Sequence, residues 1–257
     1  NDSNAFNSFI EHNVGGPHNF NNIGTYNKTE NTLTTFDLGV NFNNTGNVNV
    51  NAGTISVANA VDNLGTISTA TGTTFASTSG GANLQNHGTL QGTGTYDSAT
   101  GRAVQNFGQV QPGTATSLGK LLIAGDYTQD AVGLIEFNLA SLADFDTMDV
   151  VGNLSLNGTV HVSSLGGYNP GNGDTFTIIT FDDGVADVSD LLGVFSRVSW
   201  SGFDPGLSFT ALYFDHSVVL SASASPVPLP GGIWLLGTGL GGLMFRRRLM
   251  RMRMPVS

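Results

Sequence analysis

The chain has 257 residues, of which 11% are charged, 35 are glycine and none is cysteine. The missing cysteines exclude a disulfide framework and thiolate metal sites. Residues 1–245 hold four basic against 19 acidic residues, a formal charge of −15. Such a surface repels a phosphate backbone, so we expect no nucleic-acid partner.

One short pattern recurs through residues 20–110, with the order apolar-x-Asn-x-Gly-x-apolar. It reads FNNIGTY at 20–26, FNNTGNV at 42–48, VDNLGTI at 61–67, LQNHGTL at 84–90 and VQNFGQV at 104–110. Its fixed positions are Asn22 and Gly24, Asn44 and Gly46, Asn63 and Gly65, Asn86 and Gly88, and Asn106 and Gly108. A spacing of about twenty residues is too short for a helix-pair repeat but suffices for a coil of two or three short strands.

Apolar and polar residues alternate inside the repeats, as in 48–50 and 54–57, which indicates strands with one buried face. Coils stacked ~4.8 Å apart would bury a continuous apolar column. We expect each repeat glycine to adopt a positive φ at a corner, and each repeat asparagine to bond the asparagine of the next coil. The pattern predicts an all-β, right-handed parallel β-helix over residues 1–113. The alternative is a disordered Asn/Gly/Thr-rich segment.

Residues 114–220 read as further strands separated by glycine. The clearest are 121–123, 134–138, 154–156, 159–162 and 175–180. Asn157-Gly158, between two alternating runs, predicts a two-residue turn. Because an open β-helix end offers unpaired backbone to other chains, we expect this C-terminal β segment to cap the helix.

Both segments resemble the parallel β-helix stalks of autotransporter passengers and related bacterial surface proteins, over roughly residues 20–200. The more specific landmarks are Pro112-Gly113, Gly125 to Gln129, Asp146 to Asp149 and Gly173 to Phe176. The resemblance implies a surface role. Since no membrane-barrel segment follows in the sequence, we do not expect self-translocation.

Parallel β-helices also carry polysaccharide lyases and hydrolases, which need carboxylates with a basic partner or at a set separation. The candidates are Asp144 and Asp146, expected on one face of a strand, and Asp149, expected on the other. The available basic residues fall in no recognisable motif; they are Lys28, Arg102, Lys120 and Arg197. We therefore interpret these carboxylates as solvating a strand or accepting turn hydrogen bonds, and predict no catalytic residue and no cofactor.

Metal-ligating side chains show no defined spacing. The five histidines are His12, His18, His87, His161 and His216. The acidic residues Asp182, Asp183, Asp187 and Asp190 could hold a weakly bound Ca²⁺, but their spacing matches no calcium loop. We predict no metal site.

The C-terminal segment, 227–257, differs from everything before it. Residues 221–226 read as a flexible linker, followed by Val227, Pro228, Leu229 and Pro230. Residues 231–245 carry no charge; as a helix they would be ~22 Å long and could span a thinned membrane. The arginines that follow, in 246–253, begin with Arg246, Arg247 and Arg248. Basic flanks stay cytoplasmic, so the body is expected on the outer side of the membrane.

This proline motif, apolar run and arginine cluster resemble a PEP-CTERM sorting signal, with Leu229 where the usual motif has glutamate. The resemblance implies export and tethering to the inner membrane until a transient partner, an exosortase, processes the tail. Because the sequence starts at Asn1 with neither an initiator Met nor an apolar leader, we expect a mature form or a fragment from which any export signal has been removed. It further implies a surface or biofilm-matrix protein associated with exopolysaccharide or other surface glycans. Two alternatives remain: a β-helix polysaccharide lyase or hydrolase with the same tail, and a permanently membrane-anchored surface protein.

Overall fold

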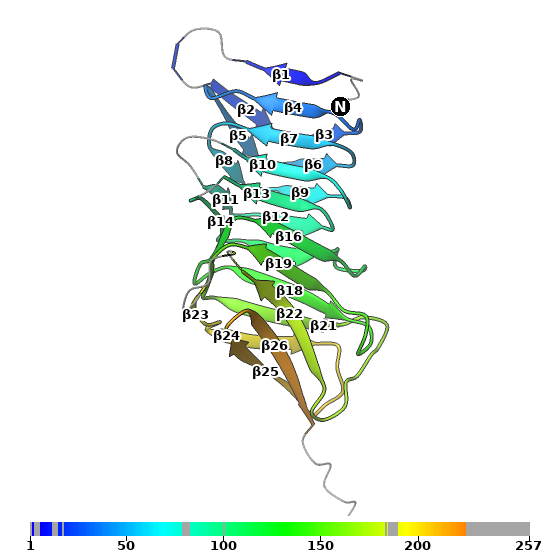
Figure 1. Ribbon diagram of the computed structural model, residues 1–257. Coiled ribbons are helices and arrows are strands. Elements are labelled where there is room, and N and C mark those ends of the chain that lie inside the picture. Colours follow the sequence, from blue (N-terminus) through cyan, green and yellow to red (C-terminus); the bar gives the residue numbers. More distant parts are fainter. Residues whose placement is uncertain are drawn as a thin grey trace, which may run out of the picture. The chain divides into compact units, whose positions relative to one another are not determined.

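Three β-sheets wind around one apolar core in a solenoid (Figure 1). The computed structural model describes residues 2, 6–11, 15–16, 18–78, 83–99, 101–182, 184 and 190–224. The linker predicted for residues 221–226 is wrong for its first four residues, which form the end of strand β26 (Ser217–Ala224). The rest of that linker, the proline motif, the predicted transmembrane helix and the arginine cluster lie outside the described residues. Among the residues that are described, no helix is long and apolar enough to cross a membrane.

Sheet I has ten strands in the spatial order β1-β4-β7-β10-β13-β16-β19-β22-β26-β25. They are β1 (Ser8–Ile10), β4 (Leu33–Phe36), β7 (Thr54–Val57), β10 (Thr74–Ser77), β13 (Thr95–Ser98), β16 (Lys120–Ala124), β19 (Thr147–Val151), β22 (Thr175–Phe181), β25 (Leu207–Phe214) and β26 (Ser217–Ala224).

Sheets II and III have eight strands each. Sheet II contains β2 (His18–Asn22), β5 (Val40–Asn44), β8 (Val61–Asn63), β11 (Leu84–Asn86), β14 (Ala103–Asn106), β17 (Asp126–Gln129), β20 (Leu154–Leu156) and β23 (Leu191–Gly193). Sheet III contains β3 (Thr25–Lys28), β6 (Asn47–Val50), β9 (Thr66–Thr69), β12 (Thr89–Gly92), β15 (Gln109–Pro112), β18 (Leu134–Leu139), β21 (Thr159–Ser164) and β24 (Arg197–Ser201).

As far as β24, each strand pairs in parallel with the strand three positions earlier in the chain: β4 with β1, β5 with β2, β6 with β3. Each coil therefore contributes one strand to each sheet. Alternate side chains point inward: Val48, Val50, Ile55 and Val57 are all fully buried. The predicted all-β parallel solenoid is confirmed. The five strands expected between 121 and 180 correspond to β16, β18, β20, β21 and β22.

The C-terminal end departs from the coil through an antiparallel hairpin. β26 pairs antiparallel with β22 and with β25, and β25 forms the outer edge of sheet I. Phe209 of this hairpin contacts Trp200 and Phe203 with ring centroids 6.1 and 4.9 Å away. The parallel stacking thus continues past residue 113 as far as β24, and among the described residues it is β25 and β26 that cover the end of the core.

Candidate ligand groove

The repeat asparagines form a buried ladder that runs through the coils. Each side-chain amide donates to the oxygen of the next: Asn22 to Asn44, Asn44 to Asn63, Asn63 to Asn86 and Asn86 to Asn106, all at 2.7 Å. Asn106 then donates to Gln129 at 2.8 Å, where the ladder ends. The remaining amide hydrogen of Asn44 bonds the carbonyl of Thr66 at 3.1 Å. The asparagine ladder predicted from the repeat is present, and its side chains are buried in the core, where they are not accessible to a ligand.

The repeat glycines serve a different purpose from the one predicted. None of the described ones has a positive φ, so the expectation of a left-handed corner is wrong. A Cβ on Gly88 would instead lie 2.1 Å from the carbonyl oxygen of Gly65, and one on Gly46 equally close to that of Gly24. At Gly46, Gly65, Gly88 and Gly108, glycine is required because the coil approaches the preceding one too closely for any side chain; Gly24, in the first repeat, has no such neighbour.

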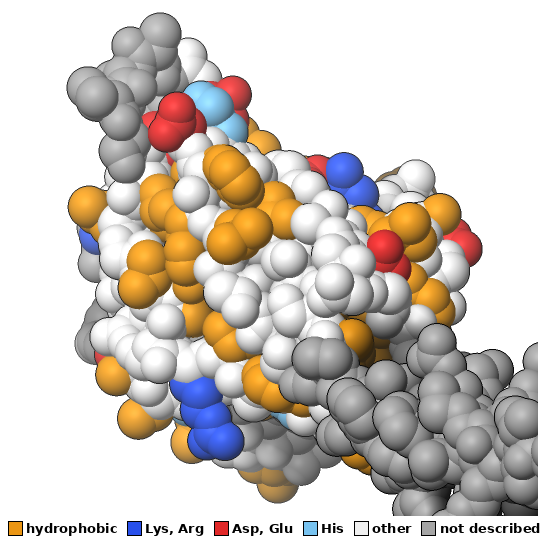
Figure 2. Space-filling view, turned by 90° about the horizontal axis from the view of Figure 1, so that it is seen from below, with side chains coloured by type: hydrophobic (Ala, Val, Ile, Leu, Met, Phe, Trp, Pro, Cys, Tyr) orange, Lys and Arg blue, Asp and Glu red, His pale blue; other side chains and the backbone are white. Residues whose placement is uncertain are grey.

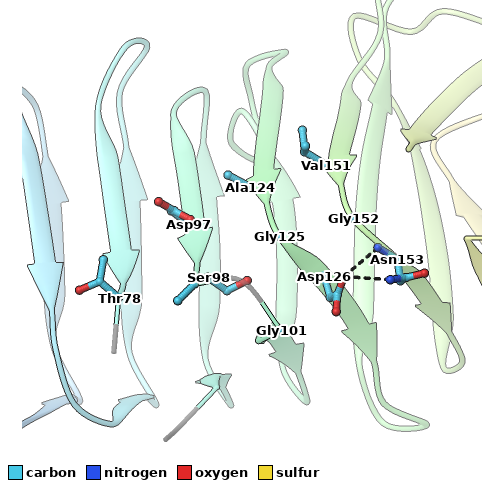
Figure 3. Close-up of a pocket in the computed structure, with 11 residues that line it drawn as sticks. Thr78, Asp97, Ser98, Gly101, Ala124, Gly125, Asp126, Val151, Gly152 and Asn153 are labelled. Atoms are coloured by element: carbon cyan, nitrogen blue, oxygen red, sulfur yellow. Dashed lines mark hydrogen bonds between the residues drawn. The ribbon is translucent and has the colours of Figure 1, made fainter. Parts of the chain in front are cut away.

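An open groove of about 680 Å³ follows the corner where strands of sheet I end and those of sheet II begin (Figure 3). It crosses the coils of β13, β16 and β19. Its lining consists of Thr78, Asp97, Ser98, Ala99, Gly101, Ala124, Gly125, Asp126, Val151, Gly152 and Asn153. The groove has polar walls and a short apolar strip, formed by Ala124 and Val151 on neighbouring strands.

Glycines form the floor of this groove for a steric reason. A Cβ on Gly152 would lie 2.6 Å from the backbone of Gly125, and one on Gly125 would lie 2.3 Å from the Ser98 hydroxyl. Gly125 also has a φ of 124°, in a region that side chains rarely adopt. The close stacking at this corner therefore excludes side chains from the floor and leaves a hollow between the flanking polar residues.

Two carboxylates give the groove its charge. The Asp126 carboxylate accepts hydrogen bonds from the backbone N–H of Asn153 at 2.9 Å and from its side-chain amide at 3.3 Å, which fixes both side chains. Burial raises the pKa of Asp97 above its ordinary value. A ligand that donates hydrogen bonds or brings positive charge would compensate this loss of hydration.

The three carboxylates considered as catalytic candidates do not come together. Asp144 is exposed in the turn before β19, where it accepts a hydrogen bond from the Ser141 hydroxyl at 2.9 Å. Asp146 also precedes β19 but is fully buried. Asp149 lies on the outer face of β19, with one oxygen 2.5 Å from the Lys120 amine. The expectation that Asp144 and Asp146 share a strand face is wrong because both precede β19, with Asp144 exposed and Asp146 buried.

Asp146 organises the backbone around it. One oxygen accepts from the Gly119 N–H at 2.7 Å; the other accepts from the backbone N–H and side-chain amide of Asn138 at 2.7 and 3.0 Å. Burial raises the pKa of Asp146 to about 7, against the opposing effect of these hydrogen bonds. Two donors from Asn138 on β18 and one from Gly119, directly before β16, converge on this carboxylate and define a structural junction.

The other charged candidates are dispersed along the solenoid. Lys28 is fully buried and donates to the Glu30 carbonyl at 2.6 Å and the Thr32 hydroxyl at 2.7 Å. His87 contacts Asp62 at 2.9 Å, and His161 contacts the Ser199 hydroxyl at 2.9 Å. His12, Asp183 and Asp187 lie outside the described residues.

Sequence reasoning missed the groove, although a signal was present. Gly125-Asp126 and Gly152-Asn153 are the same kind of dipeptide, a glycine followed by a polar residue, at equivalent points of adjacent coils. The spacing of 27 residues between them is longer than that of the Asn-x-Gly repeats, so the repeat template did not include them. No protein-family model and no curated protein matches the chain.

Proposed function

We propose that the chain is an exported structural and adhesive protein of the cell surface or biofilm matrix, built on a right-handed solenoid, that contacts surface glycans through the groove. The observation that carries this proposal is a polar groove crossing three coils of a rigid frame. Loops alone do not hold its polar groups: Asp97 and Ser98 lie on β13, and Asp126 begins β17. A preformed site of this kind binds an extended ligand with little loss of conformational entropy.

The chemistry of the groove favours a carbohydrate ligand. Carboxylate and amide oxygens accept hydrogen bonds from hydroxyl groups, and the Asn153 amide can also donate. Successive coils are ~4.8 Å apart, a distance comparable with one sugar ring along a glycan chain. The small apolar strip of Ala124 and Val151 suits the apolar face of a sugar ring.

The charge of the groove narrows the class of glycan. Asp97 and Asp126 line it, and no basic side chain is among its described lining residues. Sulfated and uronate polymers would meet like charge there, whereas neutral polymers would not and amino sugars would be attracted. We therefore infer a neutral or amino-bearing exopolysaccharide.

The C-terminal segment supplies the proposed route to the surface. The motif 227–230, the apolar run 231–245 and the arginines of 246–253 support recognition by an exosortase at the inner membrane. Intact-mass analysis of the protein from native cells and medium tests this. A form ending near Pro228 to Gly231 supports processing, whereas a form ending at Ser257 and found only in membranes supports the permanently anchored alternative.

Glycan binding is tested with the purified native protein by affinity electrophoresis through gels containing an amino-sugar polymer, a neutral glucan or a uronate polymer. We expect retardation by one of the first two, lost in Asp126→Ala. Asp204→Asn, which removes an exposed carboxylate outside the groove, is the control. Retardation equal in both variants would contradict the groove assignment. Depolymerisation of the glycan by the wild type would favour the polysaccharide-active enzyme.

A further inference from the structure

Three side chains with metal-ligating atoms converge beside the C-terminal hairpin, away from the groove. Asp182 directly follows β22, Asp190 directly precedes β23, and His216 lies in the turn between β25 and β26. One ligand atom of each lies within 4.8 Å of the others. Figure 2 shows histidine atoms beside acidic side chains at the rim of this end of the molecule. The residues come from three separate segments, so their meeting is a product of the fold.

Backbone hydrogen bonds hold all three segments in place. The Asp182 N–H donates to the Val150 carbonyl at 3.1 Å, and the Asp190 carbonyl accepts from the Leu154 N–H at 2.6 Å. The His216 carbonyl accepts from the Phe181 N–H at 3.2 Å, which ties the hairpin turn to the end of β22. The backbone at each of the three residues is therefore already fixed, so binding an ion would cost less conformational entropy than it would with flexible segments.

The separation between Asp190 and His216 points to an ion between them. The Asp190 side chain is only 3% exposed, and its carboxylate oxygen lies 3.8 Å from the His216 Nδ1. This is too long for a hydrogen bond. It matches the separation of two ligands that each lie about 2.1 Å from a common zinc ion, roughly 3 to 4 Å apart. His216 and Asp182 are exposed, so an ion can reach the buried carboxylate from solvent.

We propose that Asp182, Asp190 and His216 bind a divalent transition-metal ion of the zinc class. Imidazole together with carboxylate suits such ions, whereas calcium and magnesium prefer oxygen ligands alone. A water molecule would complete four-coordination. The ion would link the turn of the β25–β26 hairpin to both ends of the β22–β23 connection and so fasten the cover of the core. This site is independent of the proposed glycan groove.

The test uses the full-length protein after treatment with a chelator. We expect saturable 1:1 binding of Zn²⁺ by calorimetry, a rise in the thermal midpoint, and weaker responses to Ca²⁺ and Mg²⁺. Co²⁺ in place of Zn²⁺ should give the visible absorption of a four-coordinate site. His216→Ala, a change at an exposed position, should abolish the 1:1 binding and the shift in midpoint.

His87→Ala is the matched control because His87 also contacts a carboxylate, Asp62, and is likewise exposed. It should keep the full Zn²⁺ response. Asp182→Asn provides a second variant at an exposed position and should weaken Zn²⁺ binding at least tenfold. Equal binding by wild type and His216→Ala, or no saturable binding by the wild type at micromolar Zn²⁺, would overturn the proposal.

Discussion

The coils between residues 18 and 113 and those between 120 and 201 share one architecture but satisfy their buried polar groups differently. In the first region, identical neutral amides pair with one another from coil to coil. In the second, the ladder stops at Gln129, and the principal buried polar group is the carboxylate of Asp146. The amide pairing of the first region is repeated in every coil, whereas the carboxylate of the second region satisfies backbone groups at a single place.

This difference has an energetic consequence. An amide carries both donor and acceptor, so a column of amides is satisfied without charge at any length. A carboxylate only accepts when ionised, and burial makes its ionised form costly. We therefore expect the asparagine ladder of the first region to be sensitive to shape and insensitive to pH, and the Asp146 junction of the second to depend on pH. The following substitutions test that contrast.

The largest effect is expected from Gly88→Ala. Its Cβ would lie 2.1 Å from the Gly65 carbonyl oxygen, which is backbone and cannot rotate away. Separating the coils should cost about 3 kcal/mol or more of unfolding free energy, with equal cost at pH 5 and pH 8. Urea unfolding followed by circular dichroism measures it.

Gly24→Ala is the matched control for that substitution. Gly24 occupies the same repeat position, but nothing lies within 4 Å of a Cβ there and its φ is not positive. We expect a change within about 0.5 kcal/mol. Similar losses in both variants would mean that the close approach of the coils does not explain the repeat glycine.

Asn44→Ala should have the next largest effect. It removes the acceptor of the Asn22 amide and the donor to the Asn63 side-chain oxygen, so the ladder is interrupted between Asn22 and Asn63. We expect a loss of about 2–4 kcal/mol, again independent of pH. The adjacent Asn43 points outward and bonds Asn21 at the surface, so Asn43→Ala should cost less than about 0.5 kcal/mol. Equal losses would show that the buried ladder is not special.

The contrast between repeated and single features also decides which parts of the fold and of the candidate sites could be predicted from the sequence. The coil and the ladder could be predicted because Asn63 and its equivalents recur at nearly constant spacing among alternating apolar residues. The role of Gly88 could not be predicted, because a positive φ and a close approach of backbone both require glycine and the sequence does not distinguish the two reasons. The groove and the Asp182, Asp190 and His216 cluster depend on which coils lie side by side after irregular connections, and no local pattern encodes that register.

Asp146→Asn tests the second region and should have a smaller, pH-dependent effect. The Asp146 pKa is about 7 in the folded protein against an ordinary value of 3.8. The unfolded chain therefore releases this proton first as the pH rises, and the stability that the protonated group contributes declines between about pH 4 and pH 7.

Asp146→Asn removes the pH dependence due to this carboxyl group. It also places an amide NH₂, which cannot accept a hydrogen bond, against one of the N–H donors that bond the carboxylate. We expect a cost of about 1–3 kcal/mol at pH 4.5. The difference from wild type should fall by more than about 1 kcal/mol by pH 8, since one pKa unit corresponds to about 1.4 kcal/mol. Urea unfolding at both pH values measures it. If the difference in unfolding free energy between wild type and Asp146→Asn were the same at both pH values, Asp146 would not be the source of the pH dependence.

The smallest effect is expected from Lys120→Ala, which removes a surface ion pair of the second region. The Lys120 amine lies 2.5 Å from Asp149, but the lysine side chain is 68% exposed. Water and salt screen such a pair, and Asp149 keeps its hydrogen bond from the Thr180 hydroxyl at 2.6 Å.

We expect a loss below about 1 kcal/mol for Lys120→Ala, smaller still in 0.5 M salt, with the pH profile of the wild type retained. Arg197→Ala, at an exposed position on β24, controls for the change in net charge. Measured beside Asp146→Asn, this variant separates a buried from a surface carboxylate. If it cost more than about 2 kcal/mol or flattened the pH profile, the charge at the surface, and not the buried junction, would distinguish the second region from the first.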